Sequence, residues 1–93
     1  MSGRHVKRRD ANHGEIVAAF QRCGYSVLDL SQVGGGCPDL LVGRRGRDYL
    51  IEVKSGSGRV SNEQCSWAQE WLGYAPRVVR TVDDVVEFAS IRE

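Results

Sequence analysis

Two short apolar runs in the middle of the chain, at residues 39–43 and 48–54, are joined by a basic turn. Such runs on either side of a polar turn that contains glycine are typical of a β-hairpin. We expect the turn to be centred between Arg45 and Gly46, because glycine flanked by polar residues favours a tight reversal of the chain. A hairpin in this register restricts the possible folds more than any other feature of the sequence.

Three charged residues, Asp39, Glu52 and Lys54, lie within the predicted hairpin. Charged side chains are poor strand residues and are rarely buried without a partner. In the register given above, Asp39 lies directly opposite Glu52, so both side chains share one face of the sheet. Because side chains alternate along a strand, Lys54 lies on that face as well. The hairpin therefore gathers two carboxylates and one ammonium group on one patch.

Opposed carboxylates repel each other unless something offsets the repulsion. A hard divalent cation would do so, since Mg²⁺ prefers one or two carboxylates together with waters and phosphate oxygens. A bound Mg²⁺ activates a water molecule and polarises a phosphodiester, and Lys54 would orient that water or stabilise charge on the phosphate. In the alternative interpretation, Lys54 and Glu52 form a surface ion pair and Asp39 merely follows a proline turn.

Helix caps and residue periodicity indicate the remaining elements. The capping-box signature occurs three times, as Asn12 with Glu15, Ser61 with Gln64, and Thr81 with Asp84. Gly24 is expected to end the first helix, and strands are expected over 25–30 and 77–81. We expect the second helix to continue its buried side through Trp71 and Leu72. The expected buried face of the last helix comprises Val82, Val85, Val86 and Ala89. His13 is expected to be an exposed residue at the start of the first helix; the alternative is a position near the site.

The predicted order is αβββαβα, within one small domain over residues 12–93 that follows a flexible basic arm over residues 1–11. The net charge of the chain is only +1, but the arm and the hairpin turn are both basic. These segments either bind phosphates or are simply solvated. The predicted nucleic-acid-binding residues are Arg4, Lys7, Arg8, Arg9, Arg44 and Arg45.

The cysteine spacing and the lack of a long apolar run indicate the cellular compartment. Three cysteines at wide spacing form neither a metal-type pair nor a disulfide framework, which favours reduced thiols. No apolar run is long enough to span a membrane, and no signal peptide is recognised. We therefore expect a cytoplasmic protein.

The hairpin residues resemble a known motif. Pro38-Asp39, followed after a short gap by Glu52-Val53-Lys54, is similar to the motif of PD-(D/E)XK nucleases. The strings GGGCPDLLV and YLIEVK, followed by a helix that contains Gln64 and Trp67, look most like a stand-alone VRR-NUC domain of phage or bacterial type. The resemblance covers roughly residues 12–82 and implies an αβββαβ(α) restriction-endonuclease-like core of the α/β class, a small mixed sheet flanked by helices. Archaeal Holliday-junction resolvases share this skeleton.

The resemblance also implies a role for each residue that matches the motif. Asp39 and Glu52 would bind Mg²⁺ or Mn²⁺, and the backbone carbonyl of Val53 would be a further ligand. Lys54 would be the catalytic lysine. Glu15 would help to hold the metal from the first helix, and Gln64 would assist the site from the second. Both of these residues are also candidates for capping boxes, and that interpretation remains open.

The function implied is a metal-dependent endonuclease that cuts branched DNA, in particular four-way (Holliday) junctions, as a homodimer. Because such a junction is nearly two-fold symmetric and one small domain holds one active site, two coordinated cuts suit a symmetric dimer, for which Trp67 is a candidate contact. The alternatives are a nuclease with another target (nicking, flap-cutting or restriction-like) and a non-catalytic nucleic-acid-binding module.

Overall fold

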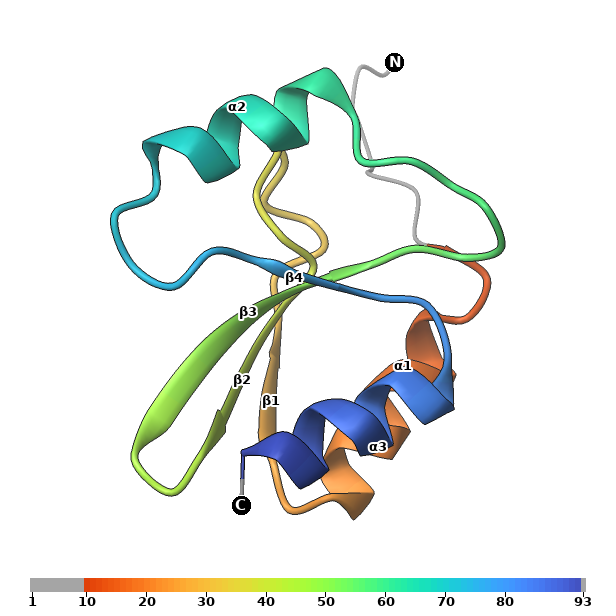
Figure 1. Ribbon diagram of the computed structural model, residues 1–93. Coiled ribbons are helices and arrows are strands. Elements are labelled where there is room, and N and C mark those ends of the chain that lie inside the picture. Colours follow the sequence, from red (N-terminus) through yellow and green to blue (C-terminus); the bar gives the residue numbers. More distant parts are fainter. Residues whose placement is uncertain (1–9, 93) are drawn as a thin grey trace.

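The computed structural model describes residues 10–92 of the chain, and its elements follow the predicted αβββαβα order (Figure 1). The elements are α1 His13–Arg22, β1 Ser26–Asp29, β2 Leu40–Arg44, β3 Arg47–Val53, α2 Asn62–Glu70, β4 Arg77–Val79 and α3 Val82–Ile91. Within residues 10–92 no helix is both long and apolar enough to cross a membrane.

The four strands form one mixed sheet in the order β1-β2-β3-β4. The first two pairings are antiparallel, and β4 runs parallel to β3. The β2–β3 ladder ends with Arg44 opposite Arg47, which confirms the predicted turn centre between Arg45 and Gly46. These two turn residues have φ of 56° and 77°, and a two-residue hairpin of the type I′ kind requires positive φ at both positions.

The hydrophobic core lies between one face of the sheet and the helices α1 and α3, which contact each other and lie side by side in Figure 1. Phe20 is fully buried at its centre, and its ring makes edge-on contacts with Tyr25 at 5.4 Å and Phe88 at 5.7 Å. Burial of one such side chain contributes about 1.5–3 kcal/mol.

Helix α1 ends as predicted at Gly24, whose φ of +89° favours glycine. The Gly24 N–H donates to the Gln21 carbonyl, and the Tyr25 N–H donates to the Phe20 carbonyl. This pair of bonds is a Schellman motif, which typically places apolar residues in contact across the helix end. The motif therefore sets the Tyr25 ring against Phe20 in the core.

The start of α1 differs from the prediction. Asn12 occupies the cap position, but its side chain makes no capping hydrogen bond, so the capping box with Glu15 was wrong. Its Nδ2 instead donates to the carbonyls of Lys54 at 3.1 Å and Arg80 at 2.7 Å. The local sequence pattern predicts that the Asn12 amide caps the helix. In the structure it bonds instead to two carbonyls at strand ends. The other two capping boxes, at Ser61 and Thr81, are confirmed.

Helix α2 lies apart from α1 and α3, at the top of Figure 1, and it has no fully buried residue. The predicted buried continuation through Trp71 and Leu72 is wrong, because these side chains are 46% and 98% exposed. The helix stops at Glu70, and Trp71 already has an extended backbone. In α3, Phe88 is buried, whereas Val86, which was expected in the core, is exposed.

Candidate active site

Two buried carboxylates lie at the end of the β2–β3 ladder that is remote from the turn. Glu52 is 4% exposed and lies between two core residues of β3, so its side chain is on the face of the sheet opposite α1 and α3. Asp39 is 6% exposed and directly precedes β2. The observed β2–β3 register therefore places both carboxylates at one end of the hairpin, as predicted.

Asp39 is fixed by the backbone around it. Its Oδ2 accepts a hydrogen bond from the Val53 N–H at 2.8 Å, and its own N–H donates to the Ile51 carbonyl at 3.0 Å. Its carbonyl accepts from the Leu30 N–H at 2.7 Å. A carboxylate held by a backbone donor has a defined direction, which is what a metal ligand or a catalytic group requires.

Two side chains converge on one oxygen of Glu52. Gln64 Nε2 donates to Glu52 Oε2 at 2.7 Å, and Lys54 Nζ lies 3.6 Å from the same atom. Gln64 also completes the capping box of α2, because its Oε1 accepts from the Ser61 N–H. Gln64 thus makes the capping contact and the contact with Glu52 through the two ends of one amide, and its role in catalysis stays a prediction.

The backbone of Lys54 is held on both sides. Its N–H donates to the Val79 carbonyl at 3.1 Å, and its carbonyl accepts from Asn12 Nδ2. The side chain has an exposure of only 13%, so its ammonium group lies in a partly desolvated position beside Glu52. Asn12 was missed as a site residue, because its sequence context is that of an ordinary helix cap.

The glycine-rich loop before Asp39 sets the position of α2. Gly36 has a φ of +85°, and a Cβ built there would collide with the backbone of Glu63 in the first turn of α2. The absence of a side chain thus permits the close approach that brings Gln64 over Glu52. A small hollow of about 90 Å³ lies here, lined by residues that include Gly36, Glu52 and Gln64.

The remaining predicted metal ligands are placed as follows. Glu15 is exposed in the first turn of α1, the helix that packs on the other face of the sheet. Among residues 10–92, no three His, Cys, Asp or Glu side chains are grouped as a metal site. The donors that fit Mg²⁺ are the carboxylates of Asp39 and Glu52, because that ion needs only one or two carboxylates besides water and phosphate oxygens. The role of the Val53 carbonyl stays a prediction.

The predicted nucleic-acid-binding residues fall into two groups. Arg4, Lys7, Arg8 and Arg9 lie outside the residues that the structure describes. Arg45 is exposed in the hairpin turn, whereas the guanidinium of Arg44 donates to the carbonyls of Cys23, Ala89 and Arg92 at the ends of α1 and α3. Arg44 therefore holds two helix ends together, and its contact with nucleic acid stays a prediction.

A hydrogen-bonded His–Asp pair that the sequence did not reveal lies near the start of α1. His13 is 4% exposed, so its predicted exposure was wrong, and its Nε2 lies 2.9 Å from Asp29 Oδ2. Burial tends to raise the pKa of Asp29, but hydrogen bonds from Ser31 and the contact with His13 outweigh it and hold the pKa at about 2. Because the pKa of Asp29 is about 2, its carboxylate stays ionised and keeps its contacts with His13 and Ser31 except in strong acid.

We expect Asp29→Asn to flatten the acid dependence of stability. The folded pKa of Asp29 is lower than the ordinary value of 3.8, so its stabilisation is present above about pH 4 and is lost as the pH falls through about 2. Melting temperatures of wild type and Asp29→Asn, measured from pH 6 to pH 2.5, should converge as the pH falls. Parallel curves would show that Asp29 gains nothing from its partners.

Comparison with known proteins gives one match. Residues 6–74 match the family model described as the VRR-NUC domain. No curated protein and no solved structure gives a significant match. The matched range contains every member of the cluster described above, from Asn12 through Asp39, Glu52 and Lys54 to Gln64.

Proposed function

The chain belongs to the VRR-NUC family, and from this premise we propose that it is a metal-dependent endonuclease selective for branched DNA. The family is a PD-(D/E)XK-like nuclease domain, so a nuclease-type function with DNA as substrate follows from membership. The observed mixed sheet flanked by helices is compatible with a restriction-endonuclease-like core. The proposal adds four points to this: a bound metal, the roles of the site residues, a preference for four-way junctions and a homodimer.

One observation carries the proposed chemistry: Lys54 and Gln64 meet at one oxygen of a carboxylate that is 4% exposed, with Asp39 held at the same end of the hairpin. Burial of a carboxylate is costly unless its charge is offset, and Lys54 supplies a single positive charge beside Glu52. A divalent cation would balance this set.

Each residue of the cluster then has a defined task. Asp39 and Glu52 would hold Mg²⁺ or Mn²⁺, which when bound supplies an activated water and polarises the scissile phosphate. Lys54 carries a fixed positive charge to the place where negative charge develops on the phosphate. Gln64 orients Glu52 through its hydrogen bond of 2.7 Å, and Asn12 holds the backbone of Lys54 in place.

The proposal is tested by cleavage of labelled four-way junction, flap and linear duplex DNA, each with Mg²⁺, with Mn²⁺ and with EDTA. We expect metal-dependent cutting that is fastest on the junction, with paired nicks across it. Cutting in EDTA would refute metal dependence, and equal rates on the three substrates would refute selectivity for branched DNA.

The homodimer has support from an exposed apolar surface. Leu72, Tyr74, Trp71 and Val78 are between 42% and 98% exposed, and they belong to α2's C-terminal connection and to β4. Trp67, the predicted contact, is half-buried and stacks on Trp71 at a ring distance of 4.9 Å. Large apolar side chains exposed within one short stretch of chain, residues 71–78, are candidates for an interaction surface. Sedimentation equilibrium should give twice the monomer mass of 10.3 kDa, and a monomer at cleavage concentrations would refute the dimer.

The metal role of Asp39 predicts an unusual result for Asp39→Asn. The asparagine oxygen can still accept the Val53 N–H, while one of two buried charges is removed. In EDTA the variant should be as stable as wild type or more so, by about 0.5–1 kcal/mol. Millimolar Mg²⁺ should stabilise wild type by mass action and the variant much less.

Thermal melts of both proteins, with EDTA and with Mg²⁺, measure the difference. If Asp39 is only an acceptor for the backbone, its substitution weakens a charge-assisted hydrogen bond and lowers stability equally in both buffers. That result, with no Mg²⁺ shift in wild type, would contradict the metal site.

A further inference from the structure

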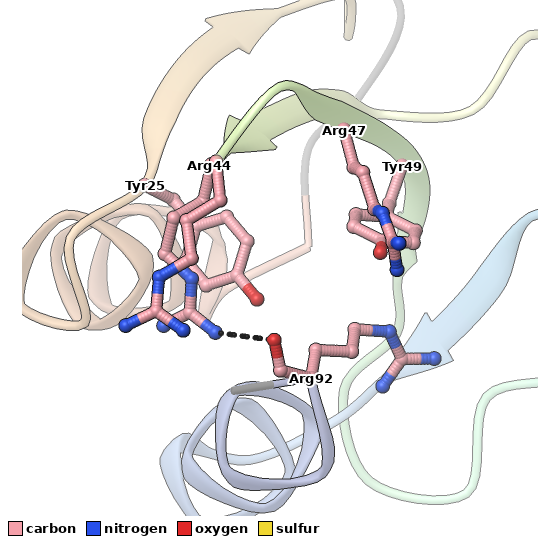
Figure 2. A pocket seen from close by; sticks show the side chains of 6 residues that line it. Tyr25, Arg44, Arg47, Tyr49 and Arg92 are labelled. Carbon is pink, nitrogen blue, oxygen red and sulfur yellow. Dashed lines mark hydrogen bonds between the residues drawn. The ribbon is translucent and has the colours of Figure 1, made fainter.

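A second concave site lies at the opposite end of the hairpin from the carboxylates. It is a hollow of about 210 Å³ lined by Tyr25, Arg44, Arg45, Arg47, Tyr49 and Arg92 (Figure 2). From Arg47 to Glu52 the strand advances five residues, or roughly 17 Å. The alternation of β3 also places Arg47 and Tyr49 on the face opposite to Glu52, so the hollow is separate from the candidate active site.

The hollow, here called the arginine pocket, has a strong excess of positive charge. Four arginines line it, and no acidic side chain is among its lining residues in the described range 10–92. The hairpin carboxylate nearest in sequence, Asp48, lies on the other face of β3 beside Gly43, where it lines a neighbouring hollow with Arg44, Arg45 and Arg47. Two helix C-termini meet at Arg44, and their partial negative charges of about −0.5 each offset only part of the positive charge.

The arginines have different amounts of freedom. The Arg44 guanidinium is hydrogen-bonded to the helix ends. Arg92 donates to the Phe88 carbonyl, and its guanidinium lies over the Phe88 ring at 3.7 Å. Arg47 is exposed, and its side chain makes no hydrogen bond or ion pair with the described residues. Figure 2 shows the guanidinium groups of Arg47 and Arg92 on the same side of the pocket, facing Arg44 across it.

A buried hydroxyl without a partner lies at the floor of this pocket. Tyr25 is 4% exposed, and its hydroxyl has no hydrogen-bond partner among the described residues. The Arg44 guanidinium lies over the Tyr25 ring at 4.4 Å, and in Figure 2 the hydroxyl points between Arg44 and Arg92. An unsatisfied buried hydroxyl is costly, and a ligand oxygen that reaches it as the arginine side chains adjust would remove that cost.

We infer that the arginine pocket is a phosphate-binding site distinct from the nuclease centre. The guanidinium groups of Arg47 and Arg92 bind phosphate oxygens, and the Tyr25 hydroxyl donates from below. Guanidinium groups match the geometry of phosphate oxygens and bind them through paired hydrogen bonds. The phosphate belongs either to a DNA backbone or to a free phosphoanion.

The test uses inorganic pyrophosphate and the intact protein in EDTA, at constant ionic strength, with calorimetry as the readout. We expect saturable binding by wild type, weakened about tenfold or more by Arg47→Gln, since a charge-assisted contact is lost. Tyr25→Phe should bind several-fold more weakly without a lower melting temperature, because its hydroxyl has no partner to lose. The matched control is Arg59→Gln, which changes an exposed arginine in the loop between β3 and α2 and should bind like wild type.

Absence of saturable binding, or equal affinity in wild type, Arg47→Gln and Tyr25→Phe, overturns the inference. An equal loss in Arg47→Gln and Arg59→Gln also overturns it, because that result indicates only general attraction to a basic surface. A short duplex that displaces pyrophosphate identifies a backbone phosphate as the ligand, and pyrophosphate that stays bound identifies a free phosphoanion; both support the pocket. No cleavage is measured, so the result does not depend on the proposed nuclease activity.

Discussion

Lys54→Ala and Glu52→Gln are each expected to reduce DNA cleavage by at least about 10²-fold while leaving DNA binding largely unchanged. Removal of one group that stabilises charge in a transition state typically has an effect of this size. Both side chains are nearly buried and meet at one site, at 3.6 Å, so they contribute little to the surface that DNA first contacts. The loss should therefore appear in kcat and not in the affinity for DNA.

Single-turnover cleavage of a labelled junction, together with a binding titration in Ca²⁺, measures the two quantities separately. The matched control for the carboxylate is Glu63→Gln, an exposed acid in the first turn of α2, and the control for the cation is Arg59→Ala. Both controls should cut at nearly the rate of wild type. Cleavage near the wild-type rate in either site variant would remove Lys54 or Glu52 from the catalytic cluster.

Gly36→Ala is expected to disable the site without touching any catalytic residue. The new methyl group would collide with the Glu63 backbone, and α2 must move to relieve the collision. Movement of α2 carries Gln64 away from Glu52, whose hydrogen bond is only 2.7 Å long. We expect a loss of about 1–3 kcal/mol in stability from overpacking and at least a tenfold fall in cleavage.

Gly35→Ala is the matched control for this variant. Gly35 also has a positive φ, +65°, but a Cβ there meets nothing within 4 Å. The control therefore has the backbone strain of alanine in the left-handed region without the collision. Thermal melts and cleavage rates of the two variants measure the effect of the collision. If Gly36→Ala behaves like Gly35→Ala, the close approach of loop and helix is not what positions Gln64.

The sequence predicted the hairpin well, because its register depends on two local properties. The turn residues Arg45 and Gly46 adopt positive φ, and strict alternation along β3 then fixes the face on which Glu52 lies. The capping boxes at Ser61 and Thr81 were predicted correctly for a similar reason, since each involves contacts only three residues apart. Local geometry therefore gave the cluster of Asp39, Glu52 and Lys54.

The parts that the sequence did not predict depend on long-range contacts. Asn12 has the sequence context of a cap but bonds to carbonyls far along the chain, and His13 is buried by its contact with Asp29. Trp71 and Leu72 continue an apolar pattern beyond the point where the helix ends. Gly36 is one of three adjacent glycines, and nothing local distinguishes it from the two that face open space.

The two hydrogen bonds of Asn12 have a consequence for the order of assembly. They join positions that are 42 and 68 residues apart in the chain, and the farther acceptor is the carbonyl of Arg80. Contacts of such separation form only after a large loop has closed, which is slow relative to local structure. On the ribosome, where synthesis proceeds from the N-terminus, Asn12 has its complete set of acceptors only when Arg80 has emerged. The backbone support of Lys54 is thus completed only after β4 and the residue that follows it have been made.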